Sequence, residues 1–125
     1  MRASVDKLAS TQFDAVRKAQ REIALHGTNA LPALEEVLQE GHPLQQKALA
    51  WHIIGEIDAM RYVSLLCAMR AQDLEVASMY LNEKALSGMS QEAIKELTEH
   101  LRSLESSVNA GQGDHLQRIR AALPK

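Results

Sequence analysis

The stretch HPLQQKALAWHIIGEI, from His42 to Ile57, decides the fold class of this protein. Its pattern predicts a helix that begins at Pro43 and runs to about Ile57. The apolar residues of this helix face nearly every direction: Ala48, Leu49, Ala50, Trp51, Ile53, Ile54 and Ile57. A helix that is apolar almost all round is buried among several neighbours. We therefore expect it inside a helical assembly, with a narrow polar strip left for solvent that consists of Gln45, His52 and Glu56.

Length and composition favour one all-α domain over residues 1–125. A chain of 125 residues is long enough to bury a core without metals or disulfides. Aromatic residues make up only 3% of it, so aliphatic residues, alanine and methionine must fill the interior. These residues suit closely packed helices. No segment combines strict alternation with β-branched residues between turn signals, so we expect no strand.

Capping and breaking residues divide the chain into five to seven helices. Gly27 and Gly41 are suited to end helices, while Asn29, Asp58 and Ser90 are suited to begin them. The connections are short, which favours antiparallel packing of consecutive helices. The expected division is an N-terminal helix within 4–27, a helical hairpin over 29–57, a second hairpin over 58–88 with helices at 59–71 and 73–87, and C-terminal capping helices over 89–125.

Residues 30–57, ALPALEEVLQEGHPLQQKALAWHIIGEI, resemble a HEAT repeat. The residues that match its first helix are Leu31, Pro32, Leu34, Val37 and Leu38, and those that match its second are Ala50, Ile53, Ile54, Gly55 and Ile57. Sliding the chain so that Leu34 meets Leu65 also pairs the apolar positions Leu38 with Met69, Ala50 with Leu81 and Ile54 with Ala85. The resemblance implies a short right-handed α-solenoid of HEAT-like hairpins.

A second repeat family offers an alternative. The spacing of Trp51, Ile54 and Gly55 is similar to the start of a TPR repeat. However, Trp51 falls late in its expected helix, and Asp58 stands where a TPR has tyrosine. We prefer the HEAT-like interpretation on these grounds.

The HEAT-like resemblance implies a non-catalytic protein–protein interaction module, a scaffold or adaptor whose partner is another protein. Second helices of such hairpins commonly line the concave side, which makes Gln45, His52 and Glu56 the candidate protein-binding residues. The alternative is a small secretion-type or assembly chaperone with TPR-like hairpins, because REIALHGTN resembles the opening helix of type III secretion needle chaperones. A third hypothesis, an enzyme acting on nucleic acid or a prosthetic group, would need a basic groove or a cluster of acids and histidines, and the middle of the chain is acidic.

The charge balance also argues against general nucleic-acid binding. The net charge is −2 and the isoelectric point is near 6.2, whereas nucleic-acid-binding proteins normally carry a basic surplus. One small basic patch, Arg17, Lys18 and Arg21, lies on the first long helix. It is either a solvated helix face or a surface for an acidic partner.

We find no group of residues spaced for catalysis or for metal binding, and we expect no catalytic residue, metal or cofactor. His52 and Glu56 lie one helical turn apart, but no HExxH, CxxC or acidic loop supplies the further ligands that a metal site needs. The single Cys67 lies in the apolar run VSLLCAM and is expected to be a buried structural thiol. Core filling is the expected role of four methionines, Met60, Met69, Met79 and Met89.

The clearest amphipathic segment lies near the C-terminus. Its apolar stripe consists of Ile94, Leu97, Leu101, Leu104 and Val108. This stripe either folds back on the hairpin at 59–87 or pairs with another copy of the chain. We expect it to fold back as a solenoid cap, and we expect a monomer rather than a homodimer.

The sequence also favours a cytoplasmic protein with no membrane partner. The N-terminal residues carry charges where a signal peptide has its apolar region. No apolar run approaches the roughly 20 residues of a membrane span.

Overall fold

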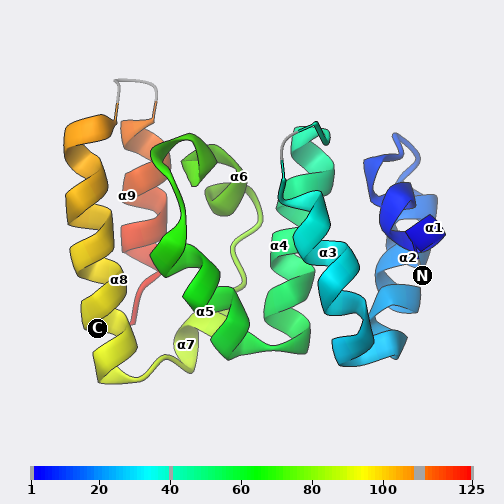
Figure 1. Ribbon diagram of the computed structural model, residues 1–125, viewed down its shortest axis with the longest axis horizontal. Coiled ribbons are helices and arrows are strands. Elements are labelled where there is room, and N and C mark those ends of the chain that lie inside the picture. The colour runs from blue at the N-terminus through cyan, green and yellow to red at the C-terminus, as the bar shows by residue number, and fades with distance from the viewer. Residues whose placement is uncertain (1, 40, 109–111, 125) are drawn as a thin grey trace.

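The computed structural model describes residues 2–39, 41–108 and 112–124, and all secondary structure within these ranges is helical (Figure 1). The α-helices are α1 (Arg2–Asp6), α2 (Phe13–His26), α3 (Leu31–Val37), α4 (Leu44–Ile57), α5 (Ala59–Ala68), α6 (Leu74–Met79), α7 (Glu83–Ser87), α8 (Gln91–Leu104) and α9 (Gly113–Ala122). Short 3-10 turns occupy Lys7–Ala9, Gly27–Ala30, Ala71–Asp73 and Glu105–Ser107. The predicted all-α class is confirmed.

The helical segments outnumber the five to seven expected, because two expected helices are each divided. The segment at 4–27 is interrupted before α2: Ser10 and Gln12 have extended backbones, and the Ser10 hydroxyl accepts a hydrogen bond of 3.0 Å from the Gln12 N–H. Such local bonds compete with a helix. The expected helix at 73–87 is divided into α6 and α7, because Asn82 Oδ1 accepts from the Ala85 N–H and caps a new helix.

The helices are distributed along the longest axis, from α1 and α2 at one end, through α3 and α4 and then α5, α6 and α7, to α8 and α9 at the other end (Figure 1). They form two layers. Helix α4 contacts both α2 and α6, and α6 contacts α9, which gives one layer. In the other layer α1 contacts α3 and α5 contacts α8, while an ion pair from Arg61 to Glu35 joins α5 to α3.

Helix α4 has the all-round burial that its sequence predicts. Its buried residues are Gln46, Ala48, Leu49, Ala50, Trp51, Ile53, Ile54 and Gly55, and the helix contacts α2, α3, α5, α6 and α7. Burial of each large apolar side chain contributes roughly 1.5–3 kcal/mol. The buried amide of Gln46 has a partner, since its Nε2 donates to the Val5 carbonyl at 3.1 Å. The buried indole N–H of Trp51 has no hydrogen-bond partner among the described residues.

The C-terminal stripe lies against the rest of the chain. Leu97 and Leu101 are fully buried, and Leu104 and Val108 pack against the core at its edge. Ile94 is half-buried. Helix α8 contacts α5 and α9, so the stripe has intramolecular neighbours.

Among the described residues, no helix is both long and apolar enough to pass through a membrane.

Candidate functional site

The three residues of the predicted polar strip on α4 have different surroundings. Gln45 is half-buried, and its Nε2 donates to two backbone carbonyls of the N-terminal segment, Leu8 at 3.2 Å and Ser10 at 3.1 Å. Its amide therefore fastens the segment before α2 onto α4. The sequence predicts Gln45 as a solvent-facing contact residue, whereas in the structure its amide binds these two carbonyl groups.

His52 is also engaged within the chain. Its Nδ1 lies 3.1 Å from the carbonyl oxygen of Tyr80 and donates a hydrogen bond to it, because a carbonyl can only accept. The other ring nitrogen lies 3.4 Å from the Glu56 carboxylate. His52 thus links α4 to the connection between α6 and α7, and Glu56 is the exposed member of the strip.

A groove of about 410 Å³ lies between α2 and α4. Its lining consists of Ser10, Thr11, Phe13, Val16, Arg17, Gln20, Gln45, Leu49 and Tyr80. We call it the α2–α4 groove. It brings one residue of the predicted strip, Gln45, together with one residue of the predicted basic patch, Arg17.

Two aromatic side chains of this groove are exposed, and sequence reasoning missed both. The Phe13 side chain is 70% exposed and that of Tyr80 is 43% exposed. The other two aromatic residues of the chain, Trp51 and Tyr62, are buried. No local pattern signals this exposure, because aromatic side chains are usually buried.

Among the residues that the structure describes, Arg17 is the one charged residue that lines the α2–α4 groove. Its guanidinium carbon lies 5.3 Å from the centre of the Phe13 ring, a cation–π geometry. Lys18 and Arg21 are exposed on the same helix but do not line the groove. The groove therefore combines apolar rings with a single positive charge and neutral amides.

A second hollow, of about 540 Å³, lies between α5 and α8, and its lining includes Met60, Cys67 and Met89. Cys67 is half-buried, whereas the sequence predicts a buried thiol. Burial, with a smaller contribution from Glu96, raises the pKa of its thiol, which keeps it protonated and a poor nucleophile. The core-filling role predicted for Met60 is wrong, since this side chain is 85% exposed.

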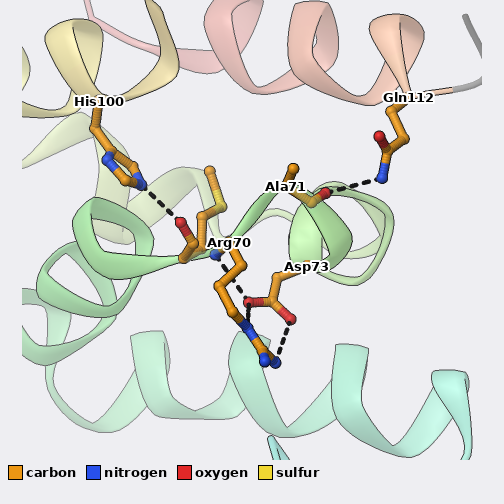
Figure 2. Close-up of polar contacts among 6 residues, drawn as sticks. Arg70, Ala71, Asp73, His100 and Gln112 are labelled. Carbon is orange, nitrogen blue, oxygen red and sulfur yellow. Dashed lines mark hydrogen bonds and ion pairs between the residues drawn. The ribbon is translucent and has the colours of Figure 1, made fainter. Parts of the chain in front are cut away.

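Several polar side chains form hydrogen bonds or ion pairs that stabilise the turn between α5 and α6 (Figure 2). The Arg70 N–H donates to the Asp73 carboxylate at 3.0 Å, and the Arg70 guanidinium contacts the same carboxylate. His100 Nε2 donates to the Met69 carbonyl at 2.7 Å, and Gln112 Nε2 donates to the Ala71 carbonyl at 3.1 Å. These contacts join the turn to α8 and to the start of α9.

No group of three or more histidine, cysteine, aspartate or glutamate side chains in the described ranges is arranged to hold a metal. His52 and Glu56 have no third such neighbour there. We take the α2–α4 groove as the candidate site because it brings two exposed aromatic side chains together with an arginine.

Comparisons with family models, with curated proteins and with solved structures find no match to this chain. The HEAT-like resemblance of residues 30–57 stays a prediction from the sequence.

Proposed function

We propose that this protein is a non-catalytic protein–protein interaction module, a scaffold or adaptor, built as a short right-handed α-solenoid of HEAT-like helical hairpins. The two layers of helices support this proposal, because stacked hairpins place alternate helices in alternate layers. In the proposed solenoid α2, α4 and α6 are second helices of successive hairpins, and they form the binding side. We further propose that it acts in the cytoplasm as a monomer.

The observation that carries the binding proposal is the exposure of Phe13 and Tyr80 in the α2–α4 groove. Leaving a phenyl ring in water forfeits roughly 1.5–3 kcal/mol of burial energy. Aromatic and arginine side chains gathered in one hollow are typical of the residues that dominate protein interfaces. Arg17 and the two rings meet this description together.

Site-specific photo-crosslinking tests the proposal. A photoreactive phenylalanine analogue replaces Thr11 or Gln20, which line the groove, and in a matched control it replaces Glu99, which is exposed on α8. We expect irradiation of living cells of the source organism to yield the same cross-linked protein from Thr11 and Gln20 and not from Glu99. Absence of a discrete product from both groove positions would contradict the proposed binding side.

A further inference from the structure

We infer that the α2–α4 groove binds a partner segment that presents an acidic side chain next to an aromatic or aliphatic one; this inference rests on the protein-binding function proposed above. The lining supplies one recognition element for each half of such a pair. Arg17 offers charge, and Phe13, Leu49 and Tyr80 offer apolar contact.

The positive charge of the groove favours an acidic side chain on the partner segment. Arg17 is exposed, forms no ion pair with another described residue and is the one charged group among the described residues of the lining. Lys18 and Arg21 add positive charge on the same helix. Helix α2 has two carboxylates: Glu22 accepts a hydrogen bond of 2.6 Å from Ser4, and Asp14, in the first turn, does not line the groove. An incoming carboxylate therefore meets a cation free to bind it with two N–H groups.

The Phe13 ring prepares Arg17 for this contact. The guanidinium lies over the ring at 5.3 Å, which restricts a side chain that would otherwise lose much rotamer freedom on binding. The same ring is 70% exposed, so an apolar side chain that follows the carboxylate can cover it. The stacked side chains of Arg17 and Phe13 can therefore bind two adjacent residues of one partner segment.

Size and charge favour a protein segment over nucleic acid. A hollow of about 410 Å³ is near the lower end for ligand pockets and admits a few side chains. Aromatic and arginine groups can also stack on bases. However, nucleic-acid binding draws its affinity from many phosphate contacts, and here one cation lines the groove of a chain whose net charge is −2.

Fluorescence anisotropy with defined probes tests the inference. The probes are a short labelled peptide of alternating phenylalanine and glutamate, the same peptide with glutamine or lysine in place of glutamate, and a labelled single-stranded oligouridine. We expect saturable binding of the glutamate peptide to the full chain, about tenfold weaker binding of the glutamine peptide, and no binding of the lysine peptide or the RNA.

Two matched variants locate the interaction. Arg17→Gln should weaken binding of the glutamate peptide about tenfold, while Arg118→Gln, the same change at an exposed position of α9, should leave it unchanged. Both residues are exposed, so far-ultraviolet circular dichroism should report wild-type folding. Equal binding by both variants, or RNA binding that depends on Arg17, would overturn the inference. If the peptides fail but the groove cross-links a discrete protein in cells, the partner chemistry is wrong and the binding function stands.

Discussion

Asn82 packs so closely on Gly55 that a β-carbon at Gly55 would lie 2.8 Å from the Asn82 side-chain nitrogen. Asn82 is 1% exposed and fixed on three sides. Its Nδ2 donates to the His52 carbonyl at 2.9 Å, its Oδ1 caps α7, and its backbone N–H donates to the Tyr62 hydroxyl at 3.0 Å. The glycine in α4 therefore makes room for the residue that joins α4, α5 and α7.

Gly55→Ala should destabilise the protein. Alanine favours a helix by about 1 kcal/mol over glycine, but the added methyl group meets a side chain that hydrogen bonds prevent from moving, and overpacking typically costs about 1–3 kcal/mol. We expect a net loss in the free energy of unfolding, measured with urea. Gly113→Ala is the control, since a β-carbon added there would meet no atom within 4 Å, and it should not destabilise. A Gly55→Ala protein as stable as wild type would show that Asn82 is not fixed.

Stability should fall at alkaline pH because of Tyr62. Burial, partly offset by the hydrogen bond from Asn82, raises the pKa of this phenol above its usual value near 10. The folded state then holds a proton that the unfolded state releases, so the free energy of unfolding falls as pH rises from the unfolded pKa to the folded one, by at most about 1.4 kcal/mol per pH unit. Tyr62→Phe should remove this part of the pH dependence, and Tyr80→Phe should retain it. Identical pH profiles for wild type and Tyr62→Phe would refute the assignment.

Substitutions of His52 and of Glu56 should differ in their effect on stability, although the sequence predicts that both residues belong to one polar strip. His52→Ala removes the hydrogen bond to the Tyr80 carbonyl and should cost about 0.5–1.5 kcal/mol of stability. Glu56→Ala removes an exposed contact worth about 0–1 kcal/mol. Thermal unfolding of the two variants measures the difference. A larger loss from Glu56→Ala would reverse the roles that the contacts assign.

Leu101→Glu should unfold the C-terminal part at every protein concentration. Leu101 is fully buried within one chain, and an unpaired carboxylate there costs several kcal/mol. Circular dichroism and sedimentation at several concentrations measure the effect, with Glu99→Gln on the exposed face as the control. A wild-type dimer that Leu101→Glu converts into a folded monomer would show instead that the stripe is an interface between copies.

The bounds and burial of α4 could be predicted because its apolar residues lie on all sides and Pro43 and Asp58 flank it. The break before α2 involves a local bond at Ser10. The break after α6 could not be predicted, since it also involves a tertiary bond between Asn82 and Tyr62. Local pattern does not reveal such partners.

The site was predictable only in part for the same reason. The sequence pattern predicts that Gln45 and His52 face solvent. In the structure their side chains form hydrogen bonds with the backbone carbonyl groups of Leu8, Ser10 and Tyr80. Arg17 is exposed on its helix as the basic patch predicts. The groove beside it depends on how α2 packs on α4, which no local pattern contains.

The most direct test of protein binding through the α2–α4 groove is the affinity of Phe13→Ala for the protein that cross-links to Thr11 and Gln20. Phe13 is largely exposed, so its removal should leave thermal stability within about 0.5 kcal/mol of wild type. Met60→Ala, which removes an exposed apolar side chain from α5, is the matched control. By isothermal titration calorimetry we expect Phe13→Ala to weaken binding about tenfold or more and Met60→Ala to bind like wild type. Wild-type affinity in a folded Phe13→Ala protein would contradict the account.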